Sequence, residues 1–344
     1  MFNPENWTLM HGILVFAACA ITIGVAGTRI TGIVDQLADR TGIGEATAGA
    51  VLLGGTTSIG GSVLSVTAAW NGNAELAVSN ALGGIAVQTF FLALADMVYR
   101  RANLEHAAAS VPNMIQNALL ITLLALIMLA PMVPNTTLWH IHPITPLLLI
   151  GYIYGIRLSQ GAHNSPMWIP TRTRETREDE PDDTSKMPSM LRLWSEFALL
   201  FVLLGAAGWT LEPSATVIAE RSGLTQTVVG IMLTAISTSI PELVTSIAAV
   251  RRGALTLAVG GIIGGNAYDT LFMAASDMAY REGSIYHTMT DDTLFWVSLT
   301  LLMSGILMMG LIRRERTGPG RIGVESLLLM LLYLGGAALL LTHL

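Results

Sequence analysis

The sequence predicts an all-α membrane protein of ten transmembrane helices, arranged as two inverted five-helix repeats. Three observations predict this fold: the composition, ten long apolar stretches, and a region that occurs twice. Of the 344 residues, 52% are hydrophobic and only 12% are charged, and the mean hydropathy is +0.59. Because soluble proteins carry about 25% charged residues, this composition excludes a water-soluble globular domain.

A helix needs about 20 apolar residues to cross the hydrocarbon core of a bilayer. Ten stretches meet this requirement: 11–29, 44–69, 75–98, 113–133, 139–157, 191–212, 226–250, 255–279, 292–312 and 323–342. The first stretch has neither a basic segment before it nor a small-residue cleavage site. We therefore interpret it as a retained helix and not as a signal peptide.

The positions of Lys and Arg predict the orientation. With the N-terminus outside, all of the 18 basic residues except Arg221 and Arg281 fall in cytoplasmic loops. This bias follows the positive-inside rule and predicts that both termini lie outside. The short loops favour a prokaryotic plasma membrane. The net charge of −6 argues against nucleic acid as a partner, and the apolar composition predicts that the chain lies in a lipid bilayer.

A polar linker is predicted to divide the chain. Residues 158–190 contain four prolines and the acidic run "RETREDEPDD", which is typical of a solvated cytoplasmic segment. The predicted halves are residues 1–157 and residues 191–344.

One region of the first half recurs in the second. Residues 38–100 align without a gap to residues 219–281, at an offset of 181 positions, and about two-fifths of the pairs are identical. In the predicted topology the two copies enter the membrane from opposite sides. Secondary transporters use such inverted repeats, with the substrate site near the midplane on broken helices. We therefore expect a transport site between the two copies.

Two carboxylates are predicted to lie inside the membrane. Glu242 occurs in "TSIPELVTS" and Asp269 in "GGNAYDTLF". A charged carboxylate at the bilayer centre costs roughly 2.5–3.5 kcal/mol, so it is expected to face a polar cavity or a bound ion. Pro241 has no N–H for the carbonyl of Ser237, which predicts a kink beside Glu242.

Other oxygen-bearing side chains surround these carboxylates in the two copies. The candidate cation ligands beside Glu242 and Asp269 are Thr238, Ser239 and Asn266 in the second copy, and Thr57, Ser58 and Gln88 in the first. Hard cations such as Ca²⁺ take about six to eight oxygen ligands. In the first copy Gly61 stands at the position of Glu242 and Gln88 at that of Asp269, so both carboxylates come from the second half.

The remaining polar residues predict less. Asp96 and Asp277 each precede an arginine by four positions, which predicts helical ion pairs with Arg100 and Arg281. The single Cys19 excludes a disulfide framework. No nucleophile motif, phosphate loop or dinucleotide fingerprint is present. We therefore expect neither an enzyme nor an organic cofactor.

The segments "TSIPELVTS" and "GGNAYDTLF" resemble the second alpha-repeat of the calcium/cation antiporter superfamily, the sodium/calcium exchangers and their relatives. Ten helices, external termini and a cytoplasmic linker also match that family. The resemblance implies that Glu242, Asp269, Thr238, Ser239, Thr57 and Ser58 bind cations, with Gln88 where the family usually has Asn. Two departures stand out. Gly61 replaces the first-repeat glutamate, and Gly84 and Gly265 replace serines that are often ligands.

The predicted function is secondary antiport of Ca²⁺ or another cation against Na⁺ or H⁺, by alternating access at the midplane. With one family glutamate missing, exchange of a monovalent cation for protons is physically easier than tight Ca²⁺ binding. Two alternatives stay open: a channel-like or uniport pathway for a monovalent cation, and a membrane scaffold or sensor that transports nothing.

Overall fold

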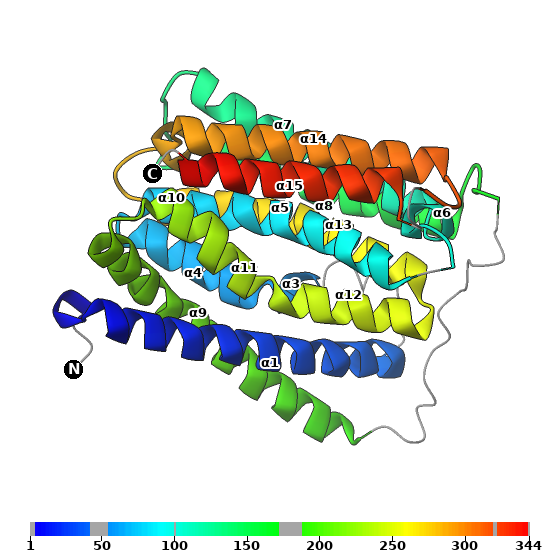
Figure 1. Cartoon of the computed structure of the whole chain (residues 1–344), viewed down its shortest axis with the longest axis horizontal. Helices are drawn as coiled ribbons and strands as arrows, with labels where there is room; N and C mark the ends of the chain where they lie inside the picture. The colour runs from blue at the N-terminus through cyan, green and yellow to red at the C-terminus, as the bar shows by residue number, and fades with distance from the viewer. Residues whose placement is uncertain (1–3, 42–53, 100, 172–187, 319–321, 343–344) are drawn as a thin grey trace.

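The computed structural model describes residues 4–41, 54–99, 101–171, 188–318 and 322–342. These residues form helices and connecting loops, with one isolated β-bridge between Leu138 and Ile141. Most helices run along the long axis of the molecule (Figure 1), and the start of α1 and the end of α15 lie at the same end. Residues 44–53 of the second predicted helix and the acidic run 174–183 lie outside the described residues.

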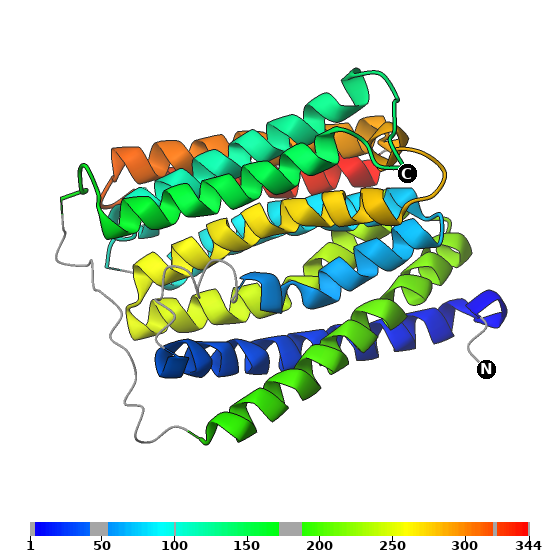
Figure 2. The same cartoon turned by 180° about the vertical axis from the view of Figure 1, so that it is seen from behind.

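Two long helices form one flank of the molecule. α1 (Leu9–Thr41) and α9 (Met190–Ser222) have 33 residues each, and they pack across one another (Figures 1 and 2). Both extend beyond the predicted stretches 11–29 and 191–212. The prediction counted only apolar residues, whereas both helices continue with polar residues past the apolar stretch. Their first residues, Leu9 and Met190, are 181 positions apart, the offset of the repeat.

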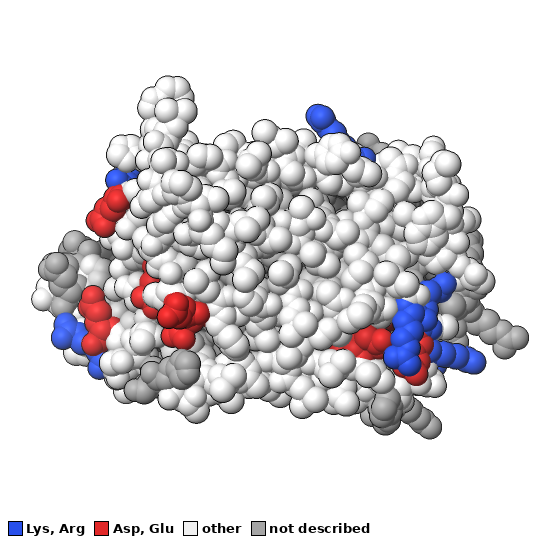
Figure 3. All heavy atoms as spheres, turned by 90° about the horizontal axis from the view of Figure 1, so that it is seen from above, with Lys and Arg blue, Asp and Glu red and all other residues white. Residues whose placement is uncertain are grey.

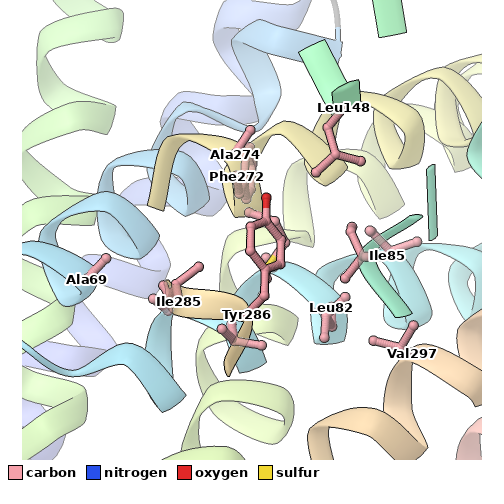
Figure 4. Packing of buried hydrophobic residues seen from close by; sticks show 14 of the residues in the cluster. Ala69, Leu82, Ile85, Leu148, Phe272, Ala274, Ile285, Tyr286 and Val297 are labelled. Carbon is pink, nitrogen blue, oxygen red and sulfur yellow. The ribbon is translucent and has the colours of Figure 1, made fainter. Parts of the chain in front are cut away.

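Two central helices are the most enclosed. α5 (Ala74–Val98) and α13 (Leu255–Ala279) each have 25 residues, and the apolar window of α5 is 78% buried. The helices that cover them are α7 (Val111–Leu129), α8 (Ile144–Asn164), α14 (Asp291–Arg313) and α15 (Val324–Thr342). In this core Leu82 and Ile85 of α5 lie with Leu148 of α8 and Val297 of α14 (Figure 4).

Helix α8 begins later than the predicted start at residue 139. Trp139 and His140 have φ values of 53° and 66°, which a right-handed helix cannot accommodate, and Pro143 precedes the first helical residue. Short elements complete the chain: η1 (Pro4–Asn6), α6 (Leu104–Ala107), η3 (Ala130–Met132) and η6 (Ile285–Thr288).

The helices that precede α5 and α13 are broken. The first comprises α3 (Gly54–Thr57) and α4 (Ile59–Trp70). The second comprises α10 (Gln226–Val228), the π-helical η5 (Val229–Thr234), α11 (Ala235–Thr238) and α12 (Ile240–Arg252). Its two parts meet at a bend of 43°, so the kink predicted at Pro241 is present.

Both breaks occur at the same place in the repeat. Ser58 has φ −85° and ψ 5°, and Ser239 has φ −98° and ψ 3°. The long helices pass directly over them. A side chain at Gly27 of α1 would collide with Pro241, and one at Gly208 of α9 would collide with the backbone of Gly60. Gly27 and Gly208 are themselves 181 positions apart, so the structural repeat includes α1 and α9.

The surface fits a lipid environment. Within the described residues, six helices are individually long and apolar enough to cross a membrane, and the bent pair 226–238 and 240–252 makes a seventh. α8 and α13, with 21 and 25 residues, also have sufficient length. Charged side chains gather toward the two ends of the face in Figure 3, and the stretch between them is uncharged.

The predicted ion pair of Asp277 with Arg281 is wrong. Asp277 Oδ2 accepts hydrogen bonds from the backbone N–H of His142 at 2.8 Å and the hydroxyl of Thr145 at 2.6 Å, and Oδ1 accepts from the N–H of Ile285 at 3.1 Å. The guanidinium of Arg281 instead lies over the ring of Trp70, 5.2 Å from its centroid. The backbone N–H groups just before α8 and in η6 have no carbonyl of a preceding helical turn to bind. They bind the carboxylate of Asp277 instead.

Asp96 binds the chain in the equivalent way. Its Oδ1 accepts from the N–H of Leu104 at 2.7 Å and its Oδ2 from the N–H of Gly323 at 2.9 Å. The predicted partner of Asp96, Arg100, lies outside the described residues. Asp96 ties the first half to the start of α15, as Asp277 ties the second half to the start of α8.

Candidate functional site

The central helices bring Gln88 and Asp269 into direct contact. Gln88 Nε2 donates a hydrogen bond of 2.6 Å to Asp269 Oδ2 and a longer one of 3.4 Å to Ser239 Oγ. Gln88 lies on α5, Asp269 on α13, and Ser239 at the break before α12. Three candidate ligands from both copies of the repeat therefore meet at one point.

Glu242 lies at the same centre, one turn after the break. Ser58 Oγ donates to Glu242 Oε1 at 3.4 Å, and the hydroxyl of Thr57, which donates to the carbonyl of Gly54 at 3.1 Å, lies near the Glu242 carboxylate. Ser58 also interacts with Asp269, and the two carboxylates are close enough to repel one another. The break at Ser58 thus places hydroxyls of the first copy against both acids of the second.

Oxygen atoms remain available at this centre. Glu242 Oε2, Asp269 Oδ1 and Gln88 Oε1 are buried without a hydrogen-bond partner. Buried carboxylate oxygens are nearly always paired, coordinated or protonated, so unpartnered ones indicate a place where a cation or a proton binds. Among the described residues no group of three His, Cys, Asp or Glu is placed to hold a metal ion. Hydroxyl and amide oxygens would have to complete any cation shell.

Two further predicted ligands donate hydrogen bonds to groups other than the carboxylates, and the Oδ1 of Asn266 is buried without a hydrogen-bond partner. Asn266 Nδ2 donates to Thr89 Oγ1 at 2.9 Å, so its amide links α13 to α5 beside the centre. Thr238 Oγ1 donates to the carbonyl of Ala235 at 3.3 Å and faces Gly61. The partner Thr89 was missed by sequence reasoning, although its identity with Thr270 in the repeat was a signal.

The position of the missing glutamate lies at the same centre. A Cβ on Gly61 would be 3.1 Å from Cε2 of Phe272 and 3.4 Å from Oγ1 of Thr238. The amide of Asn80 binds the carbonyl of Gly61 at 3.1 Å. The ring of Phe272 therefore lies beside the place that a first-copy carboxylate would occupy.

The centre is closed to solvent in this structure. Glu242 is 5% exposed, Asp269 1% and Gln88 2%, and the hydroxyl-bearing ligands at both breaks are also buried. α1 and α9 cover the two breaks from outside. Within the described residues, the two carboxylates are therefore enclosed by protein.

Comparison with known families identifies this architecture. The sequence profile described as "Sodium/calcium exchanger protein" matches residues 11–158 and 193–342, which is most of the chain. The chain belongs to the sodium/calcium exchanger family. As a member of this family of cation antiporters, it is a multi-pass integral membrane protein.

Relatives of this exchanger agree with the assignment. The "Putative antiporter CaxA" of Alkalimonas amylolytica is 26% identical over 276 residues, which cover 79% of this chain and 81% of that protein. The structure of the sodium-calcium exchanger NCX_Mj has a TM-score of 0.61 at 18% identity and covers 96% of this chain and 99% of that chain. The structure of the H⁺/Ca²⁺ exchanger CAX has a TM-score of 0.68 at 13% identity, with coverages of 96% and 86%.

Identities this low establish the fold alone. The structural similarity to these exchangers confirms the prediction of ten transmembrane helices in two inverted repeats. The roles of the eight predicted ligands stay predictions, although six of them lie together at the carboxylate centre: Glu242, Asp269, Gln88, Ser239, Ser58 and Thr57.

Proposed function

We propose that this exchanger moves a cation in exchange for protons, by alternating access at the carboxylate centre of Glu242 and Asp269. One observation carries the proposal. Gln88 and Asp269 occupy the same position in the two repeats and contact one another at 2.6 Å, beside Glu242. Equivalent residues of an inverted repeat meet only near the axis that relates the halves, where a site can open to either side.

Protons are the counter-ion that this set of side chains favours over Na⁺. Na⁺ needs a shell of several oxygens, and this chain has glycine at three positions where the family offers a ligand: Gly61, Gly84 and Gly265. A proton needs only one carboxylate oxygen. When the transported cation leaves, two adjacent buried carboxylates still require positive charge, and protons supply it without further ligands.

The charge of the centre limits the transported cation. Two carboxylates give at most two negative charges, and one oxygen of Asp269 already accepts the Gln88 amide. A monovalent cation leaves the centre anionic, whereas one Ca²⁺ neutralises it but has few ligands to coordinate it. We propose a monovalent cation as the main substrate and Ca²⁺ as a weaker one.

The orientation and the mode of action are also proposals. We place the linker in the cytoplasm and both termini outside, in a prokaryotic plasma membrane. The excess of Lys and Arg on the predicted cytoplasmic loops supports this. We propose transport without catalysis, because the family to which the chain belongs is one of cation antiporters.

Reconstituted proteoliposomes test the proposal. A pH-sensitive dye is enclosed, and Na⁺, K⁺ or Ca²⁺ is added outside. The proposal expects cation-dependent movement of protons in wild type and its loss in Glu242→Gln and Asp269→Asn. Glu220→Gln is the matched control. Glu220 is an exposed acidic residue near the end of α9, so this variant should leave transport unchanged.

Three results would contradict the proposal. Proton movement that persists in both centre variants would remove the carboxylates from the mechanism. Cation uptake that needs no ion on the opposite side would indicate a channel-like pathway. Exchange that follows a Na⁺ gradient and ignores pH would replace H⁺ by Na⁺ as the counter-ion.

A further inference from the structure

Two equivalent joints connect the halves of the chain at opposite ends of the core. On the linker face, which we define as the end of the molecule where α8 ends and α9 begins, Asp96 of α5 holds Gly323 before α15. On the opposite face Asp277 of α13 holds His142 before α8. Each joint therefore holds one half of the chain against the other by a hydrogen bond between an aspartate and a backbone N–H group.

The side chain next to each aspartate differs. On the linker face Ser326 Oγ donates to Glu105 Oε1 at 2.9 Å. At the opposite joint the equivalent Thr145 is 2.9 Å from the hydroxyl of Tyr286. Glu105 and Tyr286 are 181 positions apart in the sequence. One joint therefore contains a second carboxyl group where the other contains a phenol.

One oxygen of this second carboxyl group has no partner. Glu105 is 2% exposed, and its Oε2 makes no hydrogen bond. A Cβ placed on Gly323 would lie 3.1 Å from this oxygen and 3.4 Å from Asp96 Oδ2. Oε2 and the buried carboxylate of Asp96 thus both lie beside Gly323. Two buried anions in this arrangement are unfavourable unless a proton or a metal cation binds between or on them.

The charges that surround Glu105 come from several elements. α5 supplies the carboxylate of Asp96, and α15 supplies that of Glu325. α13 supplies apolar side chains to this cluster. Glu325 lies 3.8 Å from Arg313, which also pairs with Glu315 at 3.2 Å. His106 and Arg314 contact each other through backbone carbonyls. Among the described residues, the nearest charged groups to Glu105 are therefore acidic, and Arg313 and Arg314 are engaged with other partners.

A proton fits this place better than a metal ion. Asp96 uses both oxygens on backbone N–H groups, and Glu105 uses one on Ser326. Within the part of the chain that the structure describes, no three acidic or histidine side chains are arranged to hold a metal. We propose that the carboxyl group of Glu105 is a proton-binding site that makes the linker-face joint sensitive to pH on that side of the membrane.

The environment of Glu105 supports proton binding near neutral pH. Burial raises the pKa of Glu105 from 4.5 to about 7, and the negative charges of Asp96 and Glu325 add to the effect. With the proton bound, Glu105 no longer repels Asp96, and the joint between α5 and α15 is tightened. Without the proton, the charge of Glu105 adds to those of Asp96 and Glu325, and their mutual repulsion weakens that joint. The opposite joint has no equivalent change, because Tyr286 stays neutral there.

Infrared spectroscopy tests this site independently of transport. The measurement uses Glu242→Gln/Asp269→Asn protein, so the central carboxylates contribute no signal. The carbonyl band of a protonated carboxyl group should titrate with a midpoint near pH 7 and disappear when Glu105→Gln is added. Glu325→Gln should keep the band and lower its midpoint. Ser326→Ala should keep the band and raise its midpoint by about one pH unit, since the ionised form loses a hydrogen bond.

The outcomes separate clearly. A band that persists in Glu105→Gln, or a midpoint that Ser326→Ala leaves unchanged, overturns the proposal. The serine variant retains every charged group, so it provides the test even when Glu105→Gln does not fold. Added Ca²⁺ should leave the midpoint unchanged, and a fall in the midpoint would assign the site to a metal cation instead. Failure of exchange in liposomes would not affect any of these results.

Discussion

Gln88 and Asp269 contact one another across the two repeats of this exchanger, with 2.6 Å between Nε2 and Oδ2. They occupy the same position in the two repeats, and only Asp269 can carry a charge. The amide of Gln88 therefore acts as a neutral counterpart to the carboxylate of Asp269. This contact places an asymmetric charge at the centre of a nearly symmetric molecule.

Replacing Gln88 should weaken cation binding. Gln88→Leu keeps the size of the side chain but removes the donor to Asp269. A hydrogen bond to a charged group contributes about 1.5–3 kcal/mol, so the apparent KM for the cation should rise about tenfold or more. Initial rates of exchange in proteoliposomes measure this change.

Gln116→Leu is the control for this prediction. Gln116 is a buried glutamine of α7 that donates to Ser159 of α8 at 3.2 Å, away from the carboxylates. Its replacement should leave KM unchanged. An equal rise of KM in both variants would show that Gln88 acts through general packing.

Restoring a carboxylate at Gly61 should favour divalent cations. Gly61→Glu places a third carboxylate beside Thr238, and its Cβ alone requires the ring of Phe272 to shift by a few tenths of an ångström. Attraction between close charges in a buried site is strong, so transport of Ca²⁺ relative to Na⁺ should rise about tenfold.

Gly61→Gln is the matched variant, with the same size and no charge. Parallel measurements of ⁴⁵Ca²⁺ uptake separate the effect of charge from that of volume. Should Gly61→Gln raise the preference for Ca²⁺ as much as Gly61→Glu does, the additional charge would not be the cause.

The contact of Gly208 with the first break should limit stability. A Cβ at Gly208 would overlap the backbone carbonyl oxygen of Gly60, and backbone cannot move aside easily. Gly208→Ala should therefore lower the free energy of unfolding by about 1–3 kcal/mol. A lower Tm in detergent measures this loss.

Gly205 offers the comparison, because no atom lies within 4 Å of a Cβ at that position in the same helix. Gly205→Ala should leave Tm unchanged or raise it slightly, since alanine is the better helix former by about 1 kcal/mol. Equal losses of Tm in the two variants would disprove the close contact.

The linker-face joint predicts how stability depends on pH. The pKa of Glu105 is raised by burial from 4.5 to about 7, so the folded chain keeps a proton that the unfolded chain releases in this range. The free energy of unfolding should therefore fall as the pH rises from about 4.5 to about 7, and stay level above it.

Thermal melting in detergent across this range checks the sign. Glu105→Gln should remove this part of the pH profile, whereas Glu220→Gln should retain it. A profile of Glu105→Gln that still falls by the same amount would mean that another group carries the titration.

The local chain was sufficient to predict much of this molecule. Apolar stretches and basic loops predicted the helices, because the bilayer allows little else to cross it. Pro241 predicted the kink, because proline cannot donate the backbone hydrogen bond that would continue the preceding helix. The repeat placed Glu242 and Asp269 in equivalent elements, which was enough to nominate both as ligands.

Tertiary structure decided the contacts that bring distant residues together. The spacing of Asp277 and Arg281 indicated an ion pair, but the N–H groups of His142 and Ile285 arrive from other elements and take the carboxylate. Asn266 was nominated by its spacing from Asp269; its amide nitrogen donates to Thr89, while its Oδ1 is buried without a hydrogen-bond partner, so its role as a ligand stays a prediction. Helical spacing tells which side chains share a face, while the packing of other helices decides what that face meets.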